Sequence, residues 1–160
     1  MLTFRPAREA DAQACWDIRV EAIRAGCSRV YSPEQIRIWT SDSPSPAYAA
    51  MVERHYQLAS IEQQIVGTGM IDLQSGKVDA IFIRPTFMGL GVGRQMLAHL
   101  EQLARERHLH QVSLESTLNA APFYRHCGYA GEQIATYESP LGISLDCVPM
   151  SKTLRHSFEH

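Results

Sequence analysis

The sequence predicts an α+β domain whose central sheet is mixed, mostly antiparallel and flanked by helices. Two helical patterns follow a short N-terminal strand, and three strand-like runs with short polar turns then predict an antiparallel meander between residues 56 and 83. A glycine-rich segment next opens a long amphipathic helix that leads into another strand. If this helix is a crossover connection, the strands on either side of it are parallel, which makes the sheet mixed.

Size and composition predict one domain at residues 1–154 and a short tail at residues 155–160. The chain has 160 residues, 45% of them hydrophobic, which suffices for one core. Fifteen Lys and Arg against seventeen Asp and Glu give a formal charge of −2, which excludes nucleic-acid binding through a basic surface. The sequence contains no apolar signal region and no membrane-spanning stretch, so we expect a cytoplasmic protein without a membrane partner.

The first elements are a short strand and a helix. Residues 2–5 have the composition of a strand, which Pro6 ends. Between residues 11 and 25 apolar residues recur at helical spacing, and Gly26 follows where a helix commonly ends.

A second helix has a specific start signal. Ser32 is placed as its N-cap, Pro33 occupies the first helical position, and Gln35 completes a capping box. The resulting helix at residues 33–39 precedes a turn-rich Ser/Pro segment and a third short helix at residues 47–54.

The rest of the chain alternates strands and helices. Pro149 suggests that the last strand lies at an edge of the sheet, where it can pair with a second copy of the chain in a homodimer. Glu101 and Arg105 are spaced for an ion pair on one helix. The predicted elements are strands at 56–61, 65–73 and 78–83, a helix at 91–107, a strand at 111–115, a short helix at 120–127, and two strands at 129–137 and 143–153 around a turn at 140–142.

Cysteine and histidine spacing predicts no metal cofactor. The four cysteines lie far apart without a CxxC motif, which favours free thiols. The sequence His108-Leu109-His110 offers two ligands, whereas a zinc site needs three or four that converge. The cysteines are Cys15, Cys27, Cys127 and Cys147.

The segment Phe87–Arg94 predicts an anion-binding site. Its glycines place no Cβ atoms between ligand and backbone, and N–H groups at a helix start point outward with the positive end of the helix dipole. The GxxxxGK[ST] motif of nucleotide triphosphatases is absent. A nicotinamide-dependent oxidoreductase stays an alternative because Glu115 follows the glycines by about 20 residues, although the spacing is GxGxG and residues 84–88 separate strand from glycines.

Two segments resemble motifs of the GNAT N-acetyltransferase superfamily. Residues Val78–Leu100 resemble its motif A, whose signature is [QR]-x-x-G-x-[GA]. Here Met88–Gly93 aligns with that signature, and Ile83-Arg84-Pro85 precedes it. Residues Asn119–Tyr129 resemble its motif B, N-x-x-A-x-x-[FY]-Y-x-x-x-G-[FY], with Ala121 one place earlier than usual. Met88 stands where the family usually has Gln or Arg, which leaves the backbone donors to bind the ligand.

The resemblance implies a GNAT fold and an N-acetyltransferase with acetyl-CoA as cosubstrate. Such an enzyme moves an acetyl group to a primary amine of a small molecule or a protein by direct transfer in a ternary complex. No nucleophile for a covalent intermediate is evident, because Cys127 adjoins a helix C-terminus that disfavours a thiolate. Met88 also motivates a second hypothesis, a coenzyme A binding or sensing module that has lost transfer activity.

The resemblance also implies roles for individual residues. Tyr124 matches the general acid that protonates the departing thiolate, or alternatively packs beside Phe123. Asp79 is the candidate general base, since strand alternation places it on one face with the residues at 81 and 83. Asn119 either bonds the pantetheine arm or caps the helix that follows. The expected coenzyme A ligands are Ile81, Phe82, Ile83, Met88, Gly89, Leu90, Gly91, Val92, Gly93, Arg94 and Asn119, and the expected acceptor-site residues are Tyr31, His55 and Tyr56.

Overall fold

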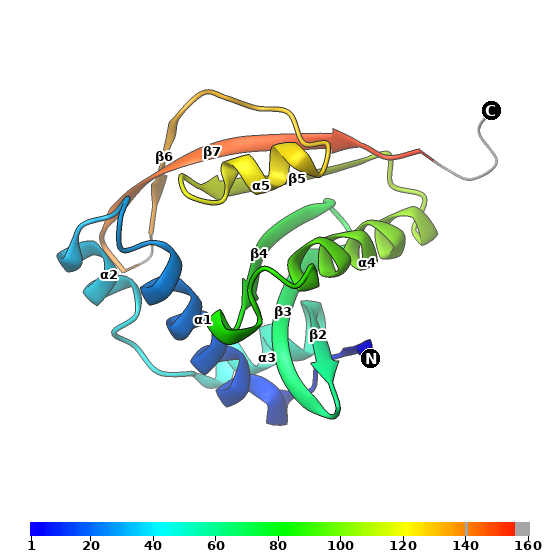
Figure 1. Cartoon of the computed structure of the whole chain (residues 1–160), viewed down its shortest axis with the longest axis horizontal. Coiled ribbons are helices and arrows are strands. Elements are labelled where there is room, and N and C mark those ends of the chain that lie inside the picture. Colours follow the sequence, from blue (N-terminus) through cyan, green and yellow to red (C-terminus); the bar gives the residue numbers. More distant parts are fainter. Residues whose placement is uncertain (140, 156–160) are drawn as a thin grey trace.

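A seven-stranded sheet with helices on both faces forms the core of the computed structural model (Figure 1). The structure describes residues 1–139 and 141–155, so of the predicted tail only Arg155 is described, and Pro140 of the predicted turn lies outside the described residues. The strand order is β1-β2-β3-β4-β5-β7-β6. In chain order the elements are β1 (Leu2–Pro6), η1 (Glu9–Asp11), α1 (Ala12–Gly26), α2 (Pro33–Trp39), α3 (Pro46–His55), β2 (Tyr56–Ile61), β3 (Gln64–Asp72), β4 (Lys77–Ile83), η2 (Pro85–Phe87), α4 (Val92–Glu106), β5 (Gln111–Thr117), α5 (Ala121–His126), β6 (Ala135–Glu138) and β7 (Ser144–Thr153).

The sheet consists of two antiparallel halves, β1 to β4 and β5 to β6, joined by one parallel contact. The pairs between β4 and β5 are Lys77 with Ser113 and Val78 with Leu114. β4 continues to Ile83 without a further pair to β5 in the described chain, and the two halves diverge (Figure 1). We call the opening between the unpaired parts of these strands the β4–β5 wedge.

A β-bulge lies where the wedge begins. Ala80 pairs with Met70 of β3 and Val78 pairs with Ile71, so Asp79 has no partner in the β3 ladder. Because an extra residue bends a strand and increases its twist, this bulge turns β4 away from β5. The parallel pairing and the crossover helix follow the sequence prediction, and the bulge accounts for the divergence.

The two faces of the sheet are covered differently. α4 and α5 pack over one face in a single large cluster, whereas α1, α2 and α3 cover the other face through two separate smaller clusters (Figure 1). Glycine lets α4 approach closely, because a Cβ atom at Gly69 of β3 would lie 2.9 Å from Met96 Sδ. Fully buried side chains of α4, including Met96 and Leu100, therefore rest directly on β3 and its neighbours.

The capping signals of the N-terminal helices are confirmed. Ser32 Oγ accepts a hydrogen bond from Gln35 N at 3.0 Å, and Gln35 Oε1 accepts one from Ser32 N at 2.8 Å. Ser45 repeats the Ser-Pro signal at α3, where its hydroxyl accepts from Tyr48 N at 3.1 Å. Each cap satisfies a first-turn N–H that has no intrahelical partner.

The C-terminal strands differ from the prediction. The strand expected at 129–137 is reduced to β6 at 135–138 and an isolated bridge between Ala130 and Ser151. Gly131 lies very close to β7, since a Cβ atom at this residue would lie 2.1 Å from Pro149 O. β7 lies between β5 and β6, so the prediction that Pro149 marks an edge strand is wrong. β6 ends its pairing at Cys147, and Pro149 therefore interrupts no bond to β6. β6 is the edge strand at this end of the sheet, and pairing with a second copy there stays a prediction.

Candidate functional site

The N-terminus of α4 lies at the end of β4, beside the wedge. Gly91 is its N-cap residue with φ +82°, and Gly89 has φ +80°, a backbone region that side-chain-bearing residues rarely adopt. No side chain caps this helix, so the first-turn N–H groups have no intrahelical or side-chain acceptor. A Cβ atom at Gly89 would meet no atom within 4 Å. The loop therefore presents uncapped donors in open space, which fits an anionic ligand.

The loop combines exposed apolar side chains with two exposed polar side chains, Arg94 and Gln95, in the first turn of α4. Met88 is 54% exposed and Leu90 is 64% exposed, so both apolar side chains lie on the surface. The groups of the loop that can bind an anion are therefore the backbone N–H groups of residues 92–94 with the helix dipole and the side chains of Arg94 and Gln95.

Backbone groups of β4 border the wedge, while its side chains pack to either side. Ile81 and Ile83 pack against the cluster beneath α4, and Phe82 packs in the cluster of α1 and α2. Within residues 1–139 and 141–155, the β5-facing backbone groups of this stretch have no strand partner. An extended ligand arm that carries amides can therefore pair with β4 in the manner of an added strand.

Tyr124 is buried on α5, next to the start of α4. It is 7% exposed and belongs to the same buried cluster as Val92 and Leu114. Its ring makes edge contacts with Phe123 at 5.1 Å and Tyr129 at 5.9 Å between centroids. Burial raises the pKa of Tyr124, so the phenol keeps its proton at neutral pH and can act as a hydrogen donor.

α4 and α5 meet at the glycine loop. A Cβ atom at Gly93 would lie 3.5 Å from Phe123 Cζ and 3.7 Å from Ile83 Cγ1, both ordinary contacts. The second residue of α4, the end of β4 and α5 thus converge at one place. The structure brings together the predicted anion loop, the predicted β4 segment and the helix that carries Tyr124.

A buried polar network includes Tyr129, whose ring packs against Tyr124. Tyr129 Oη donates to Glu101 Oε2 at 2.8 Å, and Lys152 Nζ donates to both carboxylate oxygens of Glu101 at 3.0 and 3.2 Å. Lys152 Nζ also donates to Cys127 O at 2.9 Å. The network links α4, β7 and the end of α5.

The predicted pair between Glu101 and Arg105 is wrong. Glu101 is 5% exposed on the buried face of α4, and its partner is Lys152, while Arg105 Nε donates to Arg155 O. Glu101 follows Leu97 by four residues and therefore falls on the apolar stripe of the helix. This four-residue spacing from Leu97 is the sequence signal that predicts a buried position for Glu101.

The predicted face for Asp79 is also wrong. The bulge reverses the alternation of β4, so Ile81 and Ile83 pack on the α4 side together with Val78, whereas Asp79 is exposed on the opposite side. There its carboxylate interacts electrostatically with Arg19, among other groups. Asp79 still lies at the start of the wedge, because it directly follows the last residue of β4 that pairs with β5.

The three predicted acceptor-site residues lie in three different surroundings. Tyr56 is buried on β2 near Asp79, whose charge contributes to raising the pKa of Tyr56 after the larger effects of burial and of Tyr48. His55, at the end of α3, interacts electrostatically with Asp72. Tyr31 Oη donates to Asp146 O and accepts from Leu118 N at 3.1 Å, which uses the hydroxyl to join the loop before α2 to β7 and to the residue that follows β5.

Asn119 does not cap α5. The helix begins one residue later than predicted, its N-cap is Ala120, and no side chain accepts a capping hydrogen bond. The Asn119 side chain instead lies at the end of α1, where a Cβ atom at Gly26 would lie 3.4 Å from Asn119 Nδ2. Asn119 therefore spans from the end of β5 to α1.

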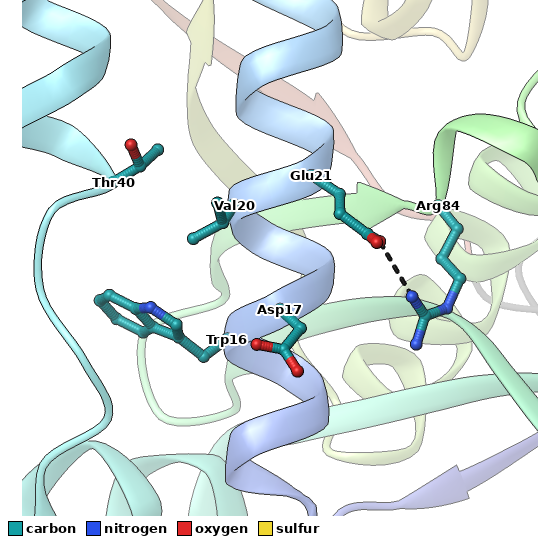
Figure 2. Close-up of a pocket in the computed structure, with 6 residues that line it drawn as sticks. All are labelled: Trp16, Asp17, Val20, Glu21, Thr40 and Arg84. Atoms are coloured by element: carbon teal, nitrogen blue, oxygen red, sulfur yellow. Dashed lines mark hydrogen bonds and ion pairs between the residues drawn. The ribbon is translucent and has the colours of Figure 1, made fainter.

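A surface pocket lies over α1. Figure 2 shows Trp16 and Val20 on the side of α1 that faces Thr40, while Glu21 is directed toward Arg84. Arg84 Nη1 donates to Glu21 Oε2 at 2.9 Å, and Arg84 Nε donates to Ile65 O at 2.8 Å. These bonds hold α1 against the end of β4, one residue before η2.

Residues 1–139 and 141–155 contain neither a metal-ligand cluster nor a membrane-spanning helix. No three His, Cys, Asp or Glu side chains of these residues converge as metal ligands. Within the same residues, no helix combines the length and apolarity that crossing a bilayer requires.

Comparisons with known proteins agree with this geometry. The family model described as "Acetyltransferase (GNAT) domain" matches residues 27–154. The uncharacterized N-acetyltransferase YafP of Escherichia coli K12 is 24% identical over 128 residues, which span 80% of this chain and 81% of YafP. The crystal structure of a GCN5-related N-acetyltransferase from Rhodopseudomonas palustris superposes with a TM-score of 0.88 at 27% identity, covering 95% of each chain. The PaiA N-acetyltransferase of Thermoplasma acidophilum, solved with coenzyme A, gives a TM-score of 0.70 at 13% identity over 96% of this chain and 99% of PaiA.

Proposed function

The chain belongs to the GNAT acetyltransferase family, and from this premise we propose that it transfers the acetyl group of acetyl-CoA to a primary amine. The amine belongs to a small molecule or a protein, and transfer is direct within a ternary complex. One observation carries the proposal: the β4–β5 wedge opens at a bulge beside the uncapped N-terminus of α4. A thioester on a long phosphorylated arm needs both features, one for the arm and one for the phosphates.

The coenzyme fits the groups that border the wedge. The N–H groups at the start of α4 would bind the pyrophosphate, and the free backbone edge of Ile81–Ile83 would bind the amides of the pantetheine arm. PaiA, which shares this fold, was solved in complex with coenzyme A, and this supports coenzyme A as the ligand. Met88 contributes no polar side chain, so we expect backbone donors to provide most of the affinity.

The reaction requires one proton acceptor and one proton donor. The amine attacks the thioester carbonyl carbon with its lone pair, so an ammonium must first lose one proton, and the nitrogen loses a second proton once the C–N bond has formed. Asp79 would accept these protons in turn, directly or through water, and release them to solvent. The bond between carbonyl carbon and sulfur then breaks, and Tyr124 would donate its phenolic proton to the departing sulfur. Because burial raises its pKa, Tyr124 holds this proton at neutral pH and regains one from solvent after each turnover.

The two alternative functions have different support. A dinucleotide-binding oxidoreductase does not fit, since its fold needs a mainly parallel sheet and this sheet has one parallel contact. A coenzyme A sensing module without transferase activity keeps the same binding site. Met88 has an exposed apolar side chain, which predicts weaker coenzyme A binding and is the observation behind the sensing module. The presence of Tyr124 and Asp79 supports a catalytically active transferase.

The test combines binding with turnover. Acetyl-CoA at about 100 times its Kd should stabilise the protein by about 2.7 kcal/mol in thermal unfolding, and NAD should not. Incubation with acetyl-CoA and a broad amine panel, followed by mass spectrometry, should reveal an N-acetylated product together with free coenzyme A. Binding without any acetylated amine would support the sensing module, and the absence of acetyl-CoA binding would reject both functions.

A further inference from the structure

The face covered by α1, α2 and α3 has a polar region between its two apolar clusters. Arg19 of α1 links these clusters, because its Nη1 donates to Trp39 O at 3.1 Å in one while its charge interacts with Tyr48 and Tyr56 of the other. Other polar side chains reach the same region from β4, β5 and β6. We call the set the polar gap, and its members are Arg19, Tyr56, Lys77, Asp79, Glu115 and Tyr137.

Arg19 carries a charge without a counterion. Among residues 1–139 and 141–155, no carboxylate lies within ion-pair distance of its guanidinium. The group donates one side-chain hydrogen bond, to Trp39 O, and its Cζ lies 4.7 Å from the centroid of the Trp16 ring. A guanidinium has five N–H donors, so most of its capacity to bind an anion is unused. Burial lowers the pKa of Arg19, which reflects the cost of a desolvated cation.

Asp79 is the complementary unpaired charge. Lys77 Nζ binds Glu115 Oε1 at 2.8 Å, which neutralises that pair within the polar gap. In the described part of the chain Asp79 forms no ion pair, although it attracts the Arg19 charge from a longer distance. One cation and one carboxylate therefore remain unpaired at the start of the wedge.

We infer that the acceptor is an amine that also carries a carboxylate, as a free amino acid does. Arg19 binds the carboxylate through its planar guanidinium, and Asp79 faces the ammonium group that must lose a proton. A zwitterion matches the two unpaired charges one to one, whereas a phosphate dianion would add repulsion from the nearby carboxylates. This inference rests on the proposed acetyl transfer and deepens it by stating the substrate class.

The first arm of the test compares acceptors that differ only in the carboxylate. Wild-type protein with acetyl-CoA is offered L-phenylalanine and phenethylamine, L-tryptophan and tryptamine, and L-lysine and cadaverine, and products are quantified by mass spectrometry. We expect kcat/KM for the favoured amino acid to exceed that of its matched amine by about 10- to 100-fold, the range of a charged hydrogen-bonded contact. Equal or better use of the amines would overturn the inference while leaving the acetyltransferase function intact.

The second arm changes the cation. Arg19→Gln should remove the preference for amino acids mainly through KM, so that kcat/KM for each amino acid falls toward the value for its matched amine. Arg19→Lys keeps the charge and should retain part of the preference. Arg24→Gln removes an exposed arginine of the same helix and is the matched control. A preference that survives Arg19→Gln in a folded variant would overturn the role of Arg19.

A binding measurement separates failure of the inference from failure of the proposed function. The N-acetylated forms of the same three amino acids are titrated calorimetrically into wild type and Arg19→Gln in the presence of coenzyme A. Tighter binding to wild type by about 10-fold supports the carboxylate site even if no amine is turned over, in which case the proposed function fails alone. Equal binding to both proteins rejects the carboxylate site.

Discussion

Tyr129 donates its hydroxyl hydrogen to Glu101 across 2.8 Å, and this bond joins the helix of the proposed coenzyme site to the ring that packs against Tyr124. Lys152 completes the arrangement by neutralising Glu101. One buried network therefore connects the helix that follows the proposed anion loop with the ring that packs against the proposed general acid. Changes in this network test stability, and changes at the loop and at Tyr124 test function.

Replacing Lys152 should destabilise the protein. Lys152→Met leaves the Glu101 carboxylate buried without its cation, so we expect the free energy of unfolding in urea to fall by about 2–3 kcal/mol. The double variant Glu101→Gln with Lys152→Met should recover part of this loss. Lys77→Met is the control, because its pair with Glu115 is partly exposed and should contribute less than about 1 kcal/mol. Equal losses for the two lysines would contradict the buried network.

Two alanine substitutions in the glycine loop should distinguish the effect of a positive φ angle from the effect of an added Cβ atom. Gly91 has φ +82°, so Gly91→Ala strains the start of α4 by about 1–2 kcal/mol and should weaken acetyl-CoA binding in calorimetry. Gly93 lies inside the helix, where a Cβ atom would make only ordinary contacts. Gly93→Ala should therefore keep or raise stability, by up to about 1 kcal/mol, and retain coenzyme binding. Loss of binding in both variants without a stability difference would show that φ at residue 91 is not the determinant.

Removing the phenol of Tyr124 should slow chemistry and leave coenzyme binding unchanged. Tyr124→Phe keeps the buried ring and its edge contacts but cannot protonate the thiolate. We expect kcat to fall by about 100-fold with the Kd for acetyl-CoA within about 3-fold of wild type. Steady-state kinetics with a free-thiol assay and calorimetry measure the two quantities. Unchanged kcat would assign Tyr124 a packing role only.

The stability of the protein should depend on pH through His99. Its ring stacks on Phe4 at 4.6 Å between centroids, and burial lowers its pKa below the ordinary value of 6.5. The unfolded chain then binds a proton more readily than the folded protein. The contribution of neutral His99 to the free energy of unfolding is therefore intact above about pH 6.5 and is lost as pH falls through the folded pKa. Urea titrations between pH 7.5 and 5 should show a smaller decline for His99→Gln than for wild type. Parallel declines would exclude His99 as the source.

Local signals predicted most of the fold. The capping box of Ser32 and Gln35, the Ser-Pro start of α3 and the glycines before α4 depend on contacts within a few residues, and the helices form where these signals place them. The meander strands and the parallel β4–β5 contact also follow from patterning and the crossover rule. These features need no knowledge of distant neighbours.

The candidate site depended more on distant contacts. The sequence placed the anion loop and Tyr124, and the structure adds that they converge where Gly93 approaches Phe123. Alternation could not predict the bulge at Asp79, because a single extra residue reverses the face of every residue beyond it. Tyr31 was predicted to bind substrate, yet its hydroxyl joins segments that are 87 and 115 residues away along the chain.

The sequence by itself determined the order of elements, the glycine-rich helix start and the family motifs, since these are encoded by neighbouring residues. The tertiary structure decided which charges are paired. Glu101 forms an ion pair with Lys152, which is 51 residues away along the chain, whereas Arg19 and Asp79 form no ion pair in the described chain. Side-chain pairing across a sheet follows from strand order, bulges and packing, and none of these is a local property. For this reason the sequence alone could propose a coenzyme site, whereas the proposed acceptor chemistry rests on the fold.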